Sequence, residues 1–415
     1  MTEELLIKGK AAKEASVFLK NISKSKKDEI IKNIMSALLR CKDYILNENK
    51  KDVENARING MKDTMIDRLT LTSERIDDMI EGANNLLGLK DPVGEVISMW
   101  ERPNGLKIGK KRVPMGVVGI IYEARPNVTV DAALLCLKTS NATILKGGKE
   151  AINSNIALVN VIKEALKESD VPENAVNIIE NTNREVTAEF MKLNEYLDVL
   201  IPRGGAGLIK TVVENATVPV IETGTGNCHT YVDSDCDFKM AEDIIINAKT
   251  QRPSVCNACE GIVLHKDIAE EFLPRISAKL KENGVEVRGC EKSCKICPEL
   301  KKASIEDFYT EYNDLIISVI IVESIEDAIK HINEHSTGHS ECIVTNNYFN
   351  SEKFLNEIDS ACVYVNASTR FTDGFEFGFG AEIGISTQKL HARGPMGLTE
   401  LTSVKYIVYG NGQVR

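Results

Sequence analysis

The sequence predicts an α/β protein that is built on a doubly wound parallel sheet. Two observations predict this fold class. Five short apolar runs of strand length alternate with helical segments between residues 117 and 221, and a second alternation of the same kind occupies residues 231–367. Runs that are apolar throughout are typical of parallel strands, which are buried on both faces. A chain of 415 residues is also too long for one core, so we expect two or three domains.

The segment before the first alternation predicts helices and a hairpin. Residues 3–90 contain two apolar stripes with helical spacing, one at positions 30, 34, 38, 41 and 45 and the other at positions 76, 79, 80, 83 and 87. Two extended runs, 96–100 and 106–108, then flank Asn104 and Gly105. Asn-Gly between two such runs is the strongest short signal of a β-hairpin.

Each element of the two alternations follows from its apolar pattern. In the first we expect strands at 117–122, 142–145, 176–179, 197–201 and 218–221, with helices at 130–137, 154–168, 184–193 and 206–215. In the second we expect strands at 261–264, 318–322, 342–344 and 362–365, with helices near 237–249, 267–282, 325–333 and 351–357. We expect the glycine-rich segment 372–385 to form an active-site loop and residues 404–409 to form a terminal strand.

The composition excludes several classes of partner. The 51 basic and 61 acidic side chains give a net charge of −10, which argues against nucleic acid or an anionic membrane as a main partner. The longest apolar run, residues 316–322, is far shorter than a membrane span, and no charged-then-apolar leader opens the sequence. Eleven cysteines in such a chain favour reduced thiols, and we therefore expect a cytoplasmic location.

Glycine-containing polar loops follow four of the predicted strands of the first alternation. Ligands of open α/β sheets bind beyond the carboxyl ends of the strands, where glycine allows a close approach and helix N-termini attract phosphate. No G-x-G-x-x-G is present, and each loop alone is typical of a tight strand–helix turn. Four of them on one sheet edge favour a dinucleotide. The loops are 123–127, 146–149, 202–207 and 222–227.

A cysteine in the second alternation, Cys256, has the surroundings of a reactive thiol. Arg252 and Pro253 break the helical pattern that precedes it, and small polar neighbours leave the thiol reachable from a cleft. The charge of Arg252 favours the thiolate, which is the nucleophilic form. The alternative is a cysteine in an ordinary surface loop.

Six stretches carry a resemblance to a known family. They resemble the aldehyde dehydrogenase superfamily, and closely its glutamyl-phosphate reductase branch. The resemblance implies an aldehyde dehydrogenase-like fold with a Rossmann-type nucleotide-binding domain (1–96 and 114–227), an α/β catalytic domain (228–395) and a small β oligomerisation arm (97–113 with 396–415). The stretches are 114–119, 122–127, 202–205, 221–229, 251–258 and 379–397.

The resemblance also implies catalytic roles. Cys256 matches the nucleophile of the family, whose thiolate displaces phosphate from an acyl phosphate and forms a thioester. Glu222 occupies the position of the general base of the superfamily, although phosphate release does not require a base that activates water. The oxyanion-hole asparagine corresponds to Arg125 in a gapless comparison or to Asn127 if two residues are inserted.

For the cofactor, Lys146 is similar to the lysine that binds the nucleotide ribose in this family. NAD-preferring members commonly place a glutamate three residues later, but this chain has Lys149 there. An ammonium attracts a 2′-phosphate, so the expected cofactor is NADP. Glu311 resembles the glutamate that holds the nicotinamide ribose. The glycines that we expect at the cofactor are Gly204, Gly205 and Gly224.

The implied substrate is L-glutamyl 5-phosphate, which would be reduced by NADPH to L-glutamate 5-semialdehyde, with release of phosphate, in proline biosynthesis. The expected assembly is a homodimer or a higher homo-oligomer, a glutamate kinase is the candidate protein partner, and no metal is expected. The side chains that we expect to bind the substrate are Arg125, Arg252, His391 and Arg393; surface ion pairing is the alternative for the last two.

Two other functions stay open from the residues alone. The first is a hydrolytic aldehyde dehydrogenase that uses Glu222 and water. The second is a zinc-binding or thiol-redox protein, because Cys259 forms a C-x-x-C with Cys256 and three more thiols, Cys290, Cys294 and Cys297, have ligand-like spacing. For those three we expect a solvated loop of thiols.

Overall fold

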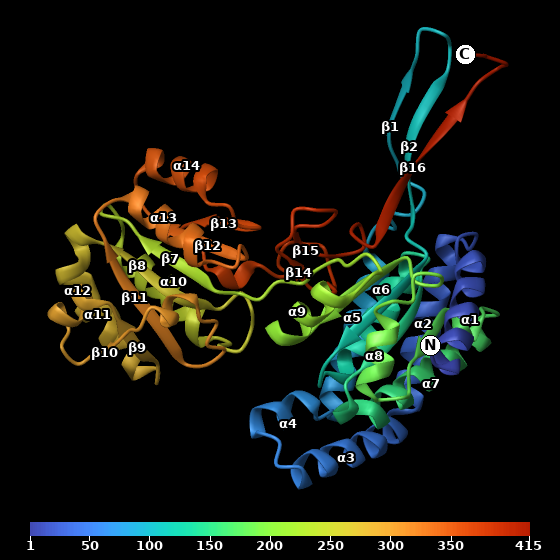
Figure 1. The fold of residues 1–415 in the computed structure, drawn as a ribbon, viewed down its shortest axis with the longest axis horizontal. Helices are drawn as coiled ribbons and strands as arrows, with labels where there is room; N and C mark the ends of the chain where they lie inside the picture. Colours follow the sequence, from blue (N-terminus) through green and yellow to red (C-terminus); the bar gives the residue numbers. More distant parts are fainter. The chain divides into compact units, whose positions relative to one another are not determined.

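The computed structural model describes residues 1–415 apart from Thr64, and the chain folds into two compact units. The first unit contains Met1–Glu222, Gly378–Gly384 and Met396–Arg415, and the second contains Thr223–Phe377 and Ile385–Pro395. Each unit has a parallel sheet of its own with helices packed on it (Figure 1). The predicted α/β fold class is therefore confirmed.

The N-terminal part of the first unit is helical, as predicted. Ser23 and Thr72 cap two of its helices, since their side chains accept hydrogen bonds from the backbone N–H groups of Lys26 and Arg75. The first apolar stripe spans two helices that meet at Cys41. The helices are α1 (Glu3–Leu19), α2 (Lys24–Arg40), α3 (Lys42–Ile58), α4 (Asp63–Leu69) and α5 (Ser73–Gly88).

Four parallel strands form the main sheet of the first unit, in the order β5-β4-β3-β6. The prediction of a fifth strand at 218–221 is wrong. This segment makes one isolated bridge, between Leu200 and Val220, because Pro219 has no N–H to donate to a ladder. The elements are β3 (Val117–Tyr122), α6 (Pro126–Lys138), β4 (Ala142–Gly147), α7 (Ile152–Glu168), β5 (Val176–Ile178), α8 (Arg184–Phe190), β6 (Val199–Arg203) and α9 (Ala206–Asn215).

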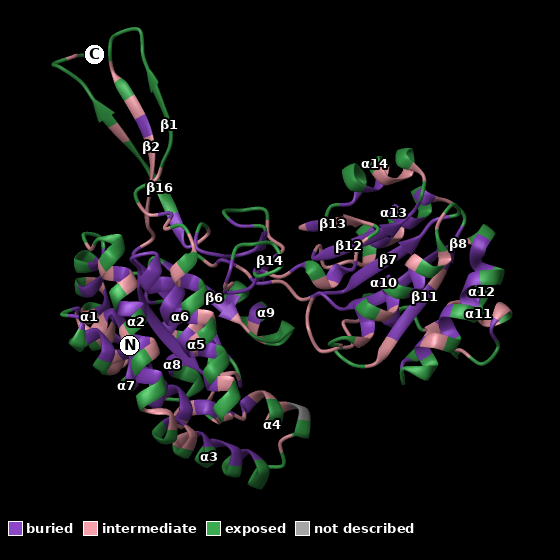
Figure 2. Ribbon diagram, turned by 180° about the vertical axis from the view of Figure 1, so that it is seen from behind, coloured by how far each residue is buried: buried purple, intermediate pink, exposed green. Residues whose placement is uncertain are grey.

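A three-stranded antiparallel sheet extends from the body of the first unit (Figure 1). It consists of the predicted hairpin, β1 (Val96–Glu101) and β2 (Lys107–Pro114), and of the predicted terminal strand, β16 (Thr402–Tyr409), which pairs with β2. The hairpin turn contains Gly105 with a φ of +84°, a conformation that glycine adopts without strain. All residues of β1 are exposed, as the green colour in Figure 2 shows.

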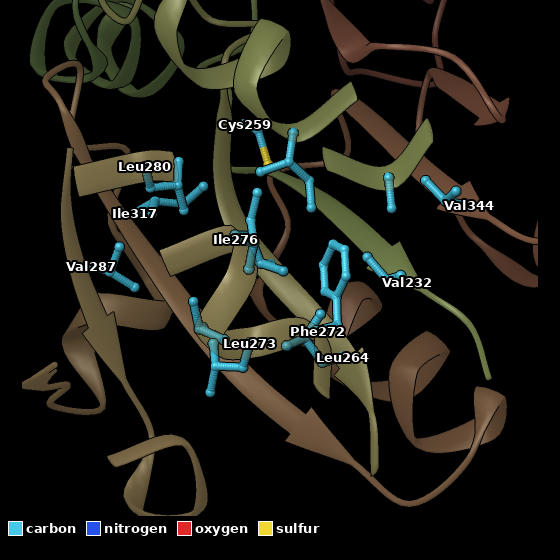
Figure 3. Packing of buried hydrophobic residues seen from close by; sticks show 14 of the residues in the cluster. Val232, Cys259, Leu264, Phe272, Leu273, Ile276, Leu280, Val287, Ile317 and Val344 are labelled. Atoms are coloured by element: carbon cyan, nitrogen blue, oxygen red, sulfur yellow. The ribbon is translucent and has the colours of Figure 1, made fainter. Parts of the chain in front are cut away.

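The second unit contains a seven-stranded parallel sheet in the order β10-β9-β11-β8-β7-β12-β13. One face packs against α10 and α11, where Phe272 and Ile276 approach Leu264 and Val232 in the core (Figure 3). The elements are β7 (Cys228–Val232), α10 (Phe238–Thr250), β8 (Cys259–His265), α11 (Lys266–Glu282), β9 (Glu286–Gly289), α12 (Glu291–Ile296), β10 (Lys301–Lys302), β11 (Ile316–Val322), α13 (Ile325–His335), β12 (Ser340–Val344), α14 (Tyr348–Glu357) and β13 (Cys362–Val365).

The expectation of a solvated thiol loop is wrong. Cys290 precedes the short helix α12, Cys294 lies within it, and Cys297, just after it, is buried. The thiol of Cys294 donates to the carbonyl oxygen of Gly289 in β9 at 3.4 Å. The segment therefore packs against the sheet. None of the helices in the described part of the chain is long and apolar enough to cross a membrane.

Candidate active site

The loop that carries Cys256 connects α10 to β8 in the second unit. Cys256 is half-buried, and its carbonyl oxygen accepts a hydrogen bond from the Cys228 thiol at 3.2 Å. The segment from Thr223 to Asn227 passes directly beside this carbonyl. A Cβ atom at Gly226 would lie 1.3 Å from the Cys256 oxygen, so that only glycine fits there.

Hydrogen bonds fix this glycine segment. The Gly226 N–H donates to Oε1 of Glu311 at 2.8 Å, and the Asn227 amide donates to the carbonyl oxygens of Phe308 and His335. The Gly224 N–H donates to the carbonyl oxygen of Ile385 at 2.7 Å. The second unit thus brings Cys256, Gly224 and Glu311, all predicted site residues, into one neighbourhood.

Residues 369–372, which lead into the predicted active-site loop 372–385, hold the other side of the Cys256 loop. The Thr369 hydroxyl donates to the carbonyl oxygen of Asn257 at 2.7 Å, and the Asn257 amide donates to that of Thr372 at 2.8 Å. The Arg370 guanidinium donates to Oε1 of Gln251 at 3.0 Å and to Oδ1 of Asn257. Arg370 therefore bridges residues on both sides of Cys256.

Beneath the loop lies a buried ion pair. Nζ of Lys249, at the end of α10, is 2.6 Å from Oε2 of Glu260 in β8, and both side chains have an exposed fraction of 0%. Burial raises the pKa of Glu260, an effect that Lys249 opposes. Cys259 is also fully buried, and burial raises its pKa to about 11. The two thiols of the C-x-x-C thus differ, since Cys256 alone lies in the loop.

In the first unit, the strand-end loops carry the residues that were predicted to bind the cofactor. Lys146 is buried at the end of β4, and its Nζ donates to the carbonyl oxygen of Gly147 at 3.2 Å. Burial lowers its pKa. An ammonium has three N–H donors, so Lys146 can serve further oxygen atoms, as a ribose would offer. Lys149 is exposed. These two lysines fit a phosphorylated nucleotide.

The glycines of the β6 loop have a partner within the protein. The Gly205 N–H, at the N-terminus of α9, donates to Oε2 of Glu123 at 2.9 Å, and a Cβ atom at Gly204 would lie 2.5 Å from the same oxygen. A carboxylate therefore occupies the position at which we predicted a ligand. A phosphate that binds this N–H must displace Glu123.

The two oxyanion candidates lie at the start of α6. Arg125 precedes the helix, and Asn127 is in its first turn, where its amide donates to Oδ2 of Asp131 at 3.1 Å. Burial raises the pKa of Asp131 to about 6, although the Asn127 bond and the charge of Arg203 oppose this rise. Glu222 is half-buried and is the last residue of its segment of the first unit.

The remaining predicted substrate residues are on the surface of the second unit. Arg252 is exposed. His391 is exposed with a φ of +67°, and the Arg393 guanidinium forms an ion pair with Asp359 at 2.8 Å. The surface ion pair that we gave as the alternative for Arg393 is therefore present. Within the described residues, no three or more His, Cys, Asp or Glu side chains are arranged to hold a metal.

Comparison with known proteins agrees with this fold and loop. The model of the aldehyde dehydrogenase family matches residues 8–315 and 310–407. The gamma-glutamyl phosphate reductase of Clostridium botulinum is 63% identical over 412 residues, which are 99% of this chain and 100% of the relative. That of Caldicellulosiruptor bescii is 62% identical over 99% of both chains.

Two solved structures extend the comparison. The crystal structure of the gamma-glutamyl phosphate reductase of Thermotoga maritima has a TM-score of 0.98 and 54% identity, with 100% of both chains covered. An acetylating aldehyde dehydrogenase of Geobacillus thermoglucosidasius shares the fold, with a TM-score of 0.72 at 17% identity over 100% of this chain and 98% of that chain. The chain belongs to the aldehyde dehydrogenase family. Within it, the chain belongs to the gamma-glutamyl phosphate reductases, which are oxidoreductases, and membership implies a nicotinamide cofactor.

Proposed function

We propose that this protein reduces L-glutamyl 5-phosphate to L-glutamate 5-semialdehyde and releases phosphate, as a step of proline biosynthesis. One observation carries the proposal: a relative named gamma-glutamyl phosphate reductase is 63% identical over 99% of the chain. The loop around Cys256 supports it, because a fixed loop with a thiol suits attack on an acyl group.

In the proposed reaction, the Cys256 sulfur bonds to the acyl carbon of the substrate. The bond from that carbon to the phosphate oxygen breaks, and phosphate leaves with the electron pair. When bound, the nicotinamide cofactor supplies a hydride to the resulting thioester. The carbonyl then re-forms as the carbon–sulfur bond breaks, which restores the thiolate and frees the semialdehyde.

The protein contributes a fixed nucleophile to this sequence. Gly226 and the Cys228 thiol contact the Cys256 carbonyl, while Arg370 and Thr369 hold Asn257. A nucleophile that is held in position reacts faster, because less orientational freedom is lost in the transition state. Since phosphate rather than water is the natural partner of the thioester, the proposed reaction needs no base that activates water.

The test is a phosphate-dependent assay in the oxidative direction. We expect the wild-type protein to reduce NADP with glutamate 5-semialdehyde only when phosphate is added, and Cys256→Ser to lose at least about 1000-fold in kcat. Cys236→Ser, at another half-buried thiol of the same unit, is the matched control and should keep its activity. Rapid reduction without phosphate would instead indicate a hydrolytic aldehyde dehydrogenase, and full activity of Cys256→Ser would exclude the thioester.

The choice of NADP rests on Lys149, which is exposed three residues after the buried Lys146. We expect Lys149→Glu to raise KM for NADP about tenfold or more while KM for NAD changes little, because the new carboxylate repels the 2′-phosphate. Lys51→Glu, an exposed charge reversal on α3, is the control. Equal changes in both values would remove this assignment.

The antiparallel sheet of β1, β2 and β16 is the proposed oligomerisation arm. Its exposed apolar side chains include Trp100 and Tyr406, whose ring centroids are 6.3 Å apart. The strands β1 and β16 are both edges of the sheet, and exposed edges pair readily with further strands. We expect light scattering to give at least the mass of a dimer, and a monodisperse monomer would contradict the proposal.

A further inference from the structure

A small cavity with charges of both signs adjoins the Cys256 loop. Its volume is about 190 Å³, well below the range of about 300–1,000 Å³ that holds a whole ligand. It therefore suits one end of a substrate molecule. Side chains of α10, of the Cys256 loop and of the segment after β13 line it: Asn247, Gln251, Arg370, Phe371, Asp373 and Glu376.

The cationic side of the cavity is held in place before any ligand binds. The Arg370 guanidinium is half-buried, and two of its N–H groups donate to the side-chain oxygens of Gln251 and Asn257. A guanidinium has five N–H groups in a rigid plane, so others can form a fork toward a carboxylate. Because Gln251 also lines the cavity, the hydrogen bond from Arg370 to Gln251 holds the guanidinium at the cavity wall.

The surroundings of Arg370 also carry like and opposite charges. Burial and the nearby charge of Arg252 lower the pKa of Arg370, whereas Asp373, Cys256 and Glu376 act in the opposite direction. Arg370, Asp373 and Glu376 all line the same cavity, so one cation and two carboxylates border one space. Asp373 is oriented by the Phe375 N–H, which donates to its Oδ1 at 2.9 Å. An anion and a cation can therefore be bound side by side.

We propose that this cavity binds the α-amino-acid end of the substrate, with Arg370 on the α-carboxylate and with Asp373 and Glu376 on the α-ammonium. This inference rests on the proposed function and names the residues that select its substrate. In glutamyl phosphate, two methylene groups separate the reacting carbonyl carbon from the α-carbon. The α-amino-acid end must therefore bind near the nucleophile loop, and Gln251 of that loop lines the cavity. The other end of the molecule, which carries the phosphate, stays at Cys256.

A mixed-charge cavity has a consequence for specificity. A simple aldehyde cannot form the contacts that we propose for Arg370, Asp373 and Glu376, whereas a zwitterion offers a group of each sign to them. We therefore expect the wild-type protein to prefer glutamate 5-semialdehyde at least tenfold in kcat/KM over two truncated analogues. The first, 5-oxopentanoate, lacks the ammonium, and the second, 4-aminobutanal, lacks the carboxylate.

The experiment compares these three aldehydes at saturating phosphate and NADP. In the double variant Asp373→Asn, Glu376→Gln we expect kcat/KM to fall at least tenfold for glutamate 5-semialdehyde and 4-aminobutanal, and to stay within twofold for 5-oxopentanoate. Asparagine keeps an oxygen that can accept the Phe375 hydrogen bond. Glu282→Gln, which removes an exposed carboxylate that lines a different cavity, is the matched control and should change none of the three values.

The Arg370 variant must be judged by the ratio of its effects on the three substrates, because Arg370 also holds the Cys256 loop. In Arg370→Lys we expect all three substrates to slow, with an additional loss of at least fivefold for the two that carry a carboxylate. Equal effects on all substrates in both variants would overturn the inference and leave phosphate-dependent turnover intact. Failure of the proposed function itself would differ, since phosphate independence or an active Cys256→Ser would reveal it.

Discussion

The polar side chains next to the two main sheets of this protein differ in their exposure to solvent. In the first unit, carboxylates at the strand ends accept backbone hydrogen bonds, from Gly205 to Glu123 at 2.9 Å and from Ala124 to Glu150 at 2.8 Å. In the second unit, an ion pair between Lys249 and Glu260, whose residues flank the Cys256 loop, is fully buried. The first arrangement is accessible to a ligand, and the second is closed.

This difference fits the proposed roles of the two units, in which the first binds the cofactor and the second holds the nucleophile. A cofactor binds and leaves, so that the groups around it must exchange partners without disturbing the sheet. A nucleophile must stay in one place, and buried polar groups enforce that, because each lost partner leaves a charge in a medium of low dielectric constant. The rigidity of the Cys256 loop thus comes at the expense of tolerance to substitution.

The largest effect is expected at the buried pair. Lys249→Met should lower the free energy of unfolding by about 3–5 kcal/mol, because it leaves the Glu260 carboxylate buried without its cation. Urea unfolding followed by circular dichroism measures this change. The double variant Lys249→Met, Glu260→Leu should recover most of the loss. A cost below about 1 kcal/mol for the single variant would show that the core tolerates the charge and would weaken the contrast between the units.

A loss in catalysis of comparable size is expected at Gly226. Gly226→Ala places a methyl group on the Cys256 carbonyl, and the backbone of the loop must shift. A displacement of about 1 Å near the reacting atoms can cost on the order of 100-fold in kcat. Gly82→Ala, in α5, is the control, since a Cβ atom there meets nothing within 4 Å. Similar kinetics for the two variants would mean that the loop is not held by this contact.

A pH dependence of stability is expected from a histidine of the second unit. Burial, and then the neighbouring His229 and His335, lower the pKa of His331 from 6.5 to about 3. Its ring also packs against Phe308, and Glu341 lies next to His229. Between pH 6.5 and 3 the unfolded chain binds a proton that the folded chain does not, so stability is complete above pH 6.5 and declines as the pH falls.

His331→Phe isolates this contribution. Each unit of pKa difference corresponds to about 1.4 kcal/mol, and the variant should lose this part of the slope of unfolding free energy against pH. Above about pH 7 the two proteins should differ by a constant amount only. Parallel curves down to about pH 4 would assign the acid sensitivity to other groups.

The smallest effect is expected in the first unit. Glu123→Gln keeps an oxygen that can accept the Gly205 hydrogen bond and removes only the charge from an exposed side chain. We expect a change of less than about 1 kcal/mol in unfolding free energy. The fold-change in KM for the cofactor, converted into free energy, should exceed the change in unfolding free energy. A loss as large as that of Lys249→Met would abolish the contrast between the two units.

The sequence predicted those elements whose local pattern and tertiary role agree. The apolar strands such as β3 and β11 were recognisable because their residues are apolar throughout. The strand β9, Glu286–Gly289, was missed since it is short and polar, and pairing with β11 rather than propensity makes it a strand. The opposite error occurred at 218–221, where an apolar run contains Pro219 and forms only a bridge.

The candidate site was predictable only in part, for a physical reason. Cys256 has local neighbours that indicate a reactive thiol. Arg370 lies 114 residues further along the chain and is brought to the Cys256 loop by folding, so no sequence periodicity relates the two residues. A usable signal did exist, because Arg370 follows the carboxyl end of β13, where ligand-binding residues of parallel sheets gather. The mixed charges of Arg370, Asp373 and Glu376 on one loop would have strengthened it.

The hydrogen bond from the Cys228 thiol to the Cys256 carbonyl bears on oxidative damage. Burial raises the pKa of Cys228 well above its usual value and that of Cys259 to about 11, so both neighbouring thiols are protonated at neutral pH. A sulfenic acid formed at Cys256 by peroxide needs a thiolate to become a disulfide. These two thiols supply none. Peroxide should therefore drive Cys256 on to the sulfinic acid, which mass spectrometry of the peptide would detect as a gain of two oxygen atoms.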